Sequence, residues 1–248
     1  MRTLIIDMET TGLEPKYNDV WNIAWLIVEE DKVVKFRDRY YPIIRFGDDY
    51  WKFSMDYEKD RELIYPRKYK ATHRHHWTGD QELIEDVKRS DIIVGHNVNF
   101  ELGFLELIIP DIRETKAQYC TMNMTTYVCK LPFPYDDYDD KVGDEYKWPK
   151  LQEAYYLLVS SNGLSGLETY IPGDWHDAKY DVFAALRIYE YMTQTKFIIP
   201  PWIWLQAGVG KGYIGQLKCK VDYQVWKFKN NINNILRTFK KDDEELPF

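Results

Sequence analysis

Three apolar stretches close to the N-terminus constrain the fold of this chain most. They span residues 3–8, 20–30 and 32–42, and the last two are joined by a short charged turn. Short strands linked in this way pair antiparallel, so the sequence predicts a three-stranded meander. The pattern then changes, because residues 80–89 have helical periodicity and residues 91–95 form a short apolar run typical of a buried strand. The chain therefore continues as an alternating α/β unit.

The rest of the chain extends this alternation. A strand is predicted over residues 117–122, and helices over residues 99–109, 125–130, 149–159 and 174–194. Residues 131–146 carry six acids against one lysine and are predicted to form a solvated loop. The paired prolines of "IIPPWIW" then interrupt the pattern. We predict an α/β fold with a mixed five-stranded sheet, its antiparallel meander first, followed by a small C-terminal extension.

Composition narrows the class of protein. The 248 residues are 45% hydrophobic, which is enough for a sizeable core, and the formal net charge is -7, so any contact with nucleic acid must use a local basic patch. The three cysteines have no metal-ligand spacing and suit reduced thiols. The sequence has no signal-peptide core and no apolar stretch long enough to span a bilayer. We expect a cytoplasmic protein without a membrane partner.

Two acids end the first apolar stretch. Side chains alternate along a strand, so Asp7 and Glu9 share one side, whereas Leu4, Ile6 and Met8 share the other. Two carboxylates converging at the edge of a core repel each other, and either a proton or a cation must sit between them. The alternative is that both lie just past the strand and face water.

Two further acids lie on the inward faces of predicted helices. Glu101 heads the apolar stripe of Phe104, Leu105 and Ile108, and Asp181 lies on the stripe of Ala178, Val182, Ala185 and Tyr189. Neither stripe offers an arginine or lysine for a buried salt bridge. Four inward acids favour a divalent metal, and oxygen-only ligands favour Mg²⁺ or Mn²⁺ over Zn²⁺. His176 precedes Asp181 at the start of the same helix and is either structural or a general base.

Three segments together resemble a known family. "IDMETTGL", "VGHNVNFELGFL" and "HDAKYDVFAAL" are similar, in order, to the three motifs of the DEDDh, or DnaQ-like, 3′-to-5′ exonuclease family, which includes the proofreading epsilon subunit of the bacterial replicative polymerase. "HHWT" at residues 75–78 also resembles a family segment. The family usually has aspartate where this chain has Glu101, and the longer side chain puts metal preference and rate in question.

The resemblance implies a fold, a site and an activity. The fold is RNase H-like with helices on both faces of the sheet, and the exonuclease domain covers residues 1–196. Two Mg²⁺ or Mn²⁺ ions are held by Asp7, Glu9, Glu101 and Asp181, with His176 as general base. The expected activity is hydrolysis from a nucleic-acid 3′ end, with single-stranded DNA in replication, repair or proofreading favoured. Expected substrate contacts are Thr10, Thr11, Gly12, Asn97, Phe100, His76 and Trp77, although helix capping is the alternative role of Asn97.

Two other functions stay open. One is a weakly active or inactive nuclease-fold module that recruits replication partners, for which Glu101 is the motivating feature. The other is a 3′-to-5′ exoribonuclease, because nothing in the sequence separates DNA from RNA.

Three segments outside these motifs bear on partners. "HRHH" at residues 73–76 is either a zinc site or, with the basic residues from position 67 onward, a lip for the incoming strand. The extension, residues 197–241, has eight basic residues against one acid between positions 211 and 241, with aromatics interleaved. It is either a single-strand binding surface or an accessory helix packed on the core. The acidic tail at residues 242–248, "DDEELPF", resembles the terminal peptide of bacterial single-stranded DNA-binding proteins and suggests docking to replication proteins, with plain disorder as the alternative.

Overall fold

The structure is a computed structural model, and it describes residues 1–42, 75–133, 146–160 and 177–207. All of these residues belong to one compact unit, Met1–Ala207. None of the helices in the described ranges has the length and apolar content needed to cross a membrane.

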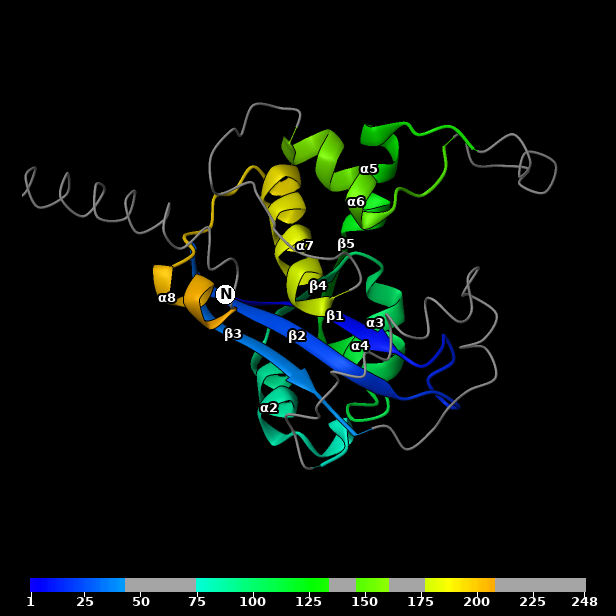
Figure 1. The fold of residues 1–248 in the computed structure, drawn as a ribbon, viewed down its shortest axis with the longest axis vertical. Helices are drawn as coiled ribbons and strands as arrows, with labels where there is room; N and C mark the ends of the chain where they lie inside the picture. Colours follow the sequence, from blue (N-terminus) through cyan, green and yellow to red (C-terminus); the bar gives the residue numbers. More distant parts are fainter. Residues whose placement is uncertain (43–74, 134–145, 161–176, 208–248) are drawn as a thin grey trace, which may run out of the picture. The chain divides into compact units, whose positions relative to one another are not determined.

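A five-stranded mixed sheet forms the centre of this unit (Figure 1). The strand order is β3-β2-β1-β4-β5, with β1 antiparallel to β2, β2 antiparallel to β3, and β4 parallel to both β1 and β5. The predicted α/β fold with its meander first is therefore confirmed. The strands are β1 (Arg2–Thr10), β2 (Val20–Glu29), β3 (Lys32–Tyr40), β4 (Ile92–Gly95) and β5 (Ala117–Cys120).

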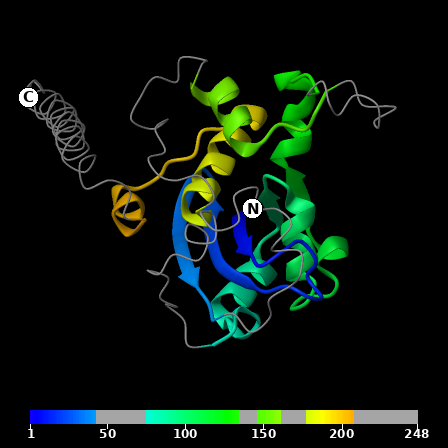
Figure 2. The same ribbon diagram turned by 45° about the vertical axis from the view of Figure 1, so that its right-hand side comes forward.

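Helices cover both faces of the sheet, as expected. Leu4, Ile6 and Met8 of β1 share a hydrophobic core with apolar residues of α2 (Gln81–Arg89) and α3 (Val98–Leu105). The long helix α7 (Ala178–Thr193) packs against β1 and β2, and Figure 2 shows it beside these strands from a second direction. Because side chains alternate along a strand, Ile5, Asp7 and Glu9 point to the face opposite that core.

The remaining helical elements are short. They are η2 (Trp77–Gly79), α4 (Ile112–Thr115), α5 (Thr121–Cys129), α6 (Leu151–Tyr155), the π-helical turn η4 (Tyr156–Ser160) and α8 (Pro201–Gln206). Ala154, Tyr155, Leu158 and Val159 pack on Ala184 and Ile188 of α7.

The element boundaries differ from the sequence expectation at several places. The helix predicted over residues 99–109 ends at Leu105, and the helix predicted from residue 125 begins at Thr121. The strand predicted to reach residue 122 ends at Cys120, and α5 begins directly after it. The helix predicted over residues 149–159 changes to a π-helical turn at Tyr156. The helix predicted from residue 174 begins at Ala178, because Asp177 has extended backbone angles and its side chain accepts a hydrogen bond from the Lys179 amide as an N-cap.

The segment from Ile198 to Gln206 packs along the free edge of β3. The Val33 amide donates to the Ile198 carbonyl at 2.9 Å, and Gln206 Nε2 donates to the Phe36 carbonyl at 3.0 Å. Trp204 stacks on Phe183 with ring centroids 4.7 Å apart. These residues lie inside the predicted extension, 197–241, yet they pack with the main unit; residues 208–248 lie outside the described part.

A buried carboxylate fastens α2 to the sheet. Asp86 accepts hydrogen bonds from Arg2 Nη2, Lys35 Nζ and Trp25 Nε1, each at 2.9 Å. The three donors come from β1, β3 and β2, so one side chain of α2 contacts all three strands of the meander. A buried charge is stable only when it is paired and hydrogen-bonded in this way.

Candidate metal centre

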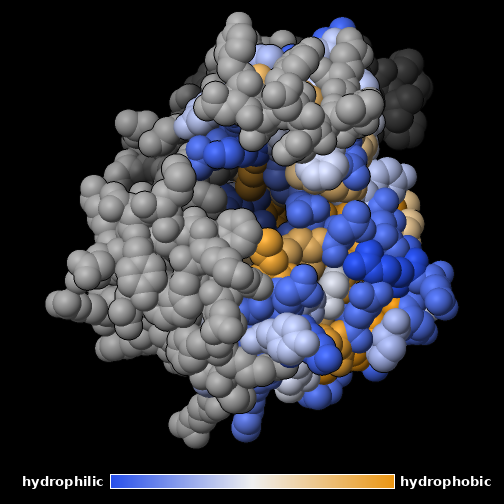
Figure 3. Space-filling model, turned by 90° about the vertical axis from the view of Figure 1, so that its right-hand side faces the viewer, coloured by the Kyte–Doolittle hydropathy of each residue, from blue (hydrophilic) through white to orange (hydrophobic). Residues whose placement is uncertain are grey.

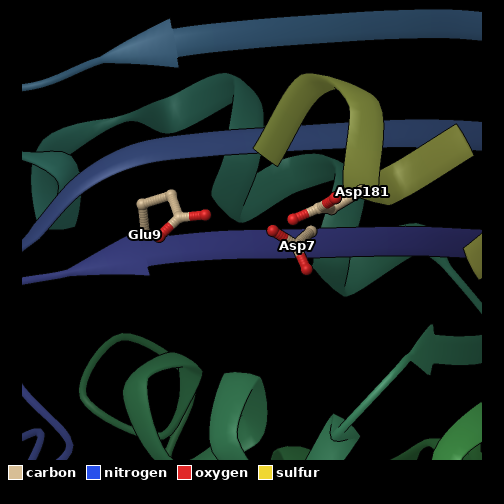
Figure 4. Close-up of side chains that lie close together, drawn as sticks. All are labelled: Asp7, Glu9 and Asp181. Atoms are coloured by element: carbon tan, nitrogen blue, oxygen red, sulfur yellow. The ribbon is translucent and has the colours of Figure 1, made fainter. Parts of the chain in front are cut away.

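Asp7, Glu9 and Asp181 meet between β1 and α7. Each offers a carboxylate oxygen, and these oxygens all lie within 4.8 Å of one another. Figure 4 shows Asp181 reaching from α7 toward Asp7 on β1, with the Glu9 carboxylate turned back toward both. Asp7 and Glu9 are brought to this face by strand alternation, and Asp181 by its place in the first turn of α7. The sequence hypothesis brought four acids together, Glu101 among them, and the structure brings the oxygens of the other three within this distance.

The electrostatics of the cluster oppose three simultaneous negative charges. Burial raises the pKa of Asp7 well above its usual range, and the negative charges of Asp181 and Glu9 raise it further. The pKa of Glu9 is raised by burial first and then by Asp181. In the described part of the chain, no lysine or arginine forms an ion pair with either strand acid. The carboxylates need protons or a bound cation to stay so close together.

Glu101 borders this cluster without joining it. It lies in the first turn of α3, is 3% exposed, and is not among the three acids whose oxygens meet. Its negative charge nevertheless raises the pKa of Asp7 and of Glu9, and burial raises its own pKa to about 8. Its Oε2 atom has no hydrogen-bond partner among the described residues.

The donor set fits a hard divalent cation. Within the described ranges, every ligand atom on offer is a carboxylate oxygen, and the buried Oε2 of Glu101 has no hydrogen-bond partner. Oxygen-only sites of high negative charge suit Mg²⁺ and Mn²⁺, whereas Zn²⁺ prefers nitrogen or sulfur. Asp7, Glu9 and Asp181 would hold one ion directly, and Glu101 is placed to contribute to a neighbouring position.

The turn that follows β1 is closed by its own hydrogen bonds. The amide of Thr11 donates to the Asp19 carbonyl at 2.8 Å, and the hydroxyl of Thr11 accepts from the Asp19 amide at 2.9 Å. A Cβ atom on Gly12 would lie 2.4 Å from Asn18 Oδ1, so only glycine fits there. Thr11 is fully buried and shapes the turn, whereas the half-buried Thr10 and Gly12 remain at its surface. The expected substrate contact at Thr11 is therefore corrected to a structural role.

The "HHWT" segment divides between surface and core. His76 is half-buried, and its Nε2 lies 2.8 Å from Asp19 Oδ1 and its Nδ1 lies 2.9 Å from Thr78 Oγ1. Trp77 is fully buried, and its ring meets Phe104 edge-on with centroids 6.4 Å apart. The expected substrate contact at Trp77 is corrected as well, because a side chain inside the hydrophobic core offers no surface to a ligand.

Asn97 and Phe100 flank Glu101 at the start of α3. Asn97 occupies the N-cap position, but its side chain makes no capping hydrogen bond and is exposed. Asn97 therefore does not cap the helix with its side chain, and its side-chain amide is available to a ligand. Phe100 is half-buried and packs edge-on against Phe104 with centroids 5.2 Å apart.

Sequence reasoning missed two acids near the cluster. The charge of Asp177 raises the pKa of both strand acids, and it pairs with Lys179 Nζ at 3.5 Å. Asp38 of β3 lies opposite Ala24, which in turn lies opposite Asp7, and burial raises the pKa of Asp38 to about 6. The spacing of four residues between Asp177 and Asp181, one helical turn, was the available signal for the first.

Several predicted residues lie outside the described part of the chain. They are His176, the basic residues at positions 67–74, the segment 211–241 and the tail 242–248.

On the face of the molecule seen in Figure 3, apolar side chains of described residues lie in a hollow, with hydrophilic side chains beside it.

Neither a protein-family model nor a curated protein sequence matches the chain. Among solved structures, it is similar to a product-bound exonuclease I, with a TM-score of 0.47 and 16% identity over 78% of this chain and 43% of that one. An Escherichia coli exonuclease I bound to a dA16 oligonucleotide gives 0.46 and 15%, over 78% and 41%. Exonuclease X with 5′-overhanging duplex DNA gives 0.41 and 17%, over 77% and 91%. The chain thus spans less than half of the exonuclease I chains.

Proposed function

We propose that this chain is a metal-dependent 3′-to-5′ exonuclease that releases nucleoside monophosphates, most readily from single-stranded DNA. The observation that carries the proposal is the meeting of Asp7, Glu9 and Asp181, whose oxygens lie within 4.8 Å of one another. Three carboxylates gathered at one point repel one another and destabilise the fold, so the arrangement indicates selection for cation binding. The order of the three sequence motifs supports the same activity.

The residues divide the work of phosphodiester hydrolysis. Asp7, Glu9 and Asp181 would together hold one divalent cation, and Glu101 would contribute to a neighbouring cation position. When bound, Mg²⁺ or Mn²⁺ supplies an activated water and charge stabilisation at the leaving oxygen. His176 takes the proton of the attacking water, for which the near-neutral pKa typical of histidine is suited.

The surface around the cluster supplies the substrate contacts. Thr10 at the end of β1 and Gly12 in the turn after it offer backbone groups to the terminal nucleotide, and Asn97 offers an exposed side-chain amide at the start of α3. Phe100 has a half-buried ring on which a base can stack. His76 is held next to the same turn by its hydrogen bond to Asp19. The basic residues at positions 67–74 provide phosphate contacts that the net charge of -7 does not.

A degradation assay tests this function. The unmodified chain should shorten end-labelled single-stranded DNA from its 3′ end with Mg²⁺ or Mn²⁺, and chelator should stop it. His176→Ala should lose nearly all turnover, whereas His75→Ala, which alters an exposed histidine, should not. Matched RNA and duplex DNA substrates identify the preferred nucleic acid, and faster digestion of RNA would make the chain an exoribonuclease. Shortening that chelator does not affect would refute the proposal.

One observation favours a second candidate. Glu101 lies outside the trio of converging oxygens, as expected of a weakly active module that recruits replication partners. The tail 242–248 is the proposed contact. If the unmodified chain turns over slowly in every metal while a synthetic tail peptide binds replication proteins, recruitment is the main role. Absence of peptide binding at high concentration removes this candidate.

A further inference from the structure

Gly95 and Glu101 are in close contact at the border of the cluster. Gly95 is the last residue of β4, and Glu101 lies in the first turn of the helix that follows. A Cβ atom on Gly95 would lie 3.0 Å from Oε2 of Glu101 and 3.2 Å from its Cδ. Both distances are shorter than ordinary van der Waals contact, so the Glu101 carboxylate rests in the space that the missing side chain leaves.

The helix that carries Glu101 has little freedom to relieve such a contact. Leu102, Phe104 and Leu105 of the same helix are fully buried in the core shared with β1 and α2. The Cα atom of Val98, in the first turn, would itself lie 3.2 Å from a Cβ on Gly95. Any side chain at position 95 would therefore displace the Glu101 carboxylate, because displacing the helix would disturb a close-packed core.

We propose that Gly95 is a positioning residue for Glu101, and that the pair allows glutamate to serve the second cation position. The inference rests on the proposed function. Glutamate is one methylene longer than aspartate, and its carboxylate lies against the bare Cα of Gly95, in space that a side chain there would occupy. The two positions are therefore coupled, so that the acid suited to position 101 depends on the residue at position 95.

Binding of Mn²⁺ to the full chain, measured by calorimetry without substrate, tests the coupling. The unmodified chain should bind two ions. Gly95→Ala should weaken the second ion by about 10- to 100-fold, the usual loss when the support of a metal ligand is removed. In a Glu101→Asp background the same glycine substitution should change the affinity by less than about twofold, because the shorter side chain no longer reaches the new methyl group.

Gly103→Ala is the matched control. It adds a methyl group to the same helix, where the new Cβ would lie 3.3 Å from Pro15 Cγ and meets no carboxylate. It should leave both affinities unchanged. Thermal unfolding without metal checks that each variant folds. If Gly95→Ala alone does not fold, comparison of Glu101→Asp with the double variant gives the answer, and equal affinities are expected.

The possible results distinguish a failure of the role proposed for Gly95 from a failure of the proposed exonuclease function. A folded Gly95→Ala that binds the second ion like the unmodified chain overturns this inference and leaves the proposed function standing. An equal loss on Gly95→Ala in both backgrounds also overturns it, since the coupling would be absent. An unmodified chain that binds no Mn²⁺ overturns the proposed function, and this inference with it.

Discussion

Nε2 of His76 lies 2.8 Å from Oδ1 of Asp19, and this bond joins the segment before α2 to the end of the turn after β1. Asp19 is fully buried, its carbonyl accepts a hydrogen bond from the Thr11 amide, and its amide donates to the Thr11 hydroxyl. The turn that presents Thr10 and Gly12 beside the acidic cluster is thus held from outside by a histidine distant in the sequence.

His76→Ala should lower the free energy of unfolding by about 1–3 kcal/mol, because it removes a hydrogen-bond partner of a buried carboxylate. Urea denaturation measures the change. His75→Ala, the exposed neighbour, is the control and should have an effect within about 0.5 kcal/mol of zero. Equal effects of the two substitutions would mean that the bond to Asp19 contributes nothing to stability.

Asp7→Asn should stabilise the metal-free protein and abolish metal binding. The raised pKa of Asp7 means that its charged form is destabilised in the fold by burial and by the neighbouring acids. We expect the free energy of unfolding at neutral pH to rise in chelator, while calorimetry detects no tight Mg²⁺ site. Asp111→Asn makes the same charge change at an exposed position and should do neither.

The metal-free protein should lose stability as the pH rises. Burial raises the pKa of Glu101 from 4.5 to about 8, so between these values the folded chain holds a proton that the unfolded chain has released. The folded state then binds more protons, and the free energy of unfolding falls with rising pH until the carboxyl is ionised in both states. Chelator-treated protein followed by urea denaturation from pH 5 to pH 8 measures the slope.

Two comparisons check that this slope belongs to the cluster. Glu101→Gln should make it shallower, since the amide does not titrate, while the raised pKa values of Asp7 and Glu9 leave part of the slope in place. Mg²⁺ affinity should increase over the same range, because the cation competes with protons for the carboxylates. A stability that rises with pH in the chelated protein would contradict the electrostatics described for the cluster.

Asp86→Ala should be among the most damaging single substitutions. It leaves Arg2 and Lys35 without their buried carboxylate and removes the acceptor of Trp25 Nε1. Loss of one member of a buried charged network costs about 3–5 kcal/mol. Glu85→Ala, at the exposed neighbouring position of α2, should change the unfolding midpoint little. Similar midpoints for the two variants would remove the role given to Asp86.

Much of the architecture could be predicted from periodicity alone. The strands and α2 follow the apolar pattern closely, because a buried strand or an amphipathic helix needs a continuous run of matching side chains. The inward direction of Glu101 and Asp181 was also predictable, since each shares a helical face with residues that are buried.

The apolar periodicity of the sequence does not give the distances between helices and strands. It places Glu101 on an inward face, but its separation from the three other acids depends on how α3 docks and how its side chain bends over Gly95. The motif "HHWT" likewise does not show which of its side chains faces inward. Trp77 is buried in the core because burial of its large apolar ring stabilises the fold more than exposure would.

The described residues that follow α7 contact the outer edge of strand β3 and cover part of it. β3 is the outer strand of the sheet, and Ile198 forms a parallel bridge with Lys32 while Gln206 binds the Phe36 carbonyl. An uncovered outer strand offers its backbone to any second strand that approaches. The short proline-containing segment covers part of this edge, so a chain shortened to end before Ile198 is expected to aggregate during refolding while retaining every acid of the cluster.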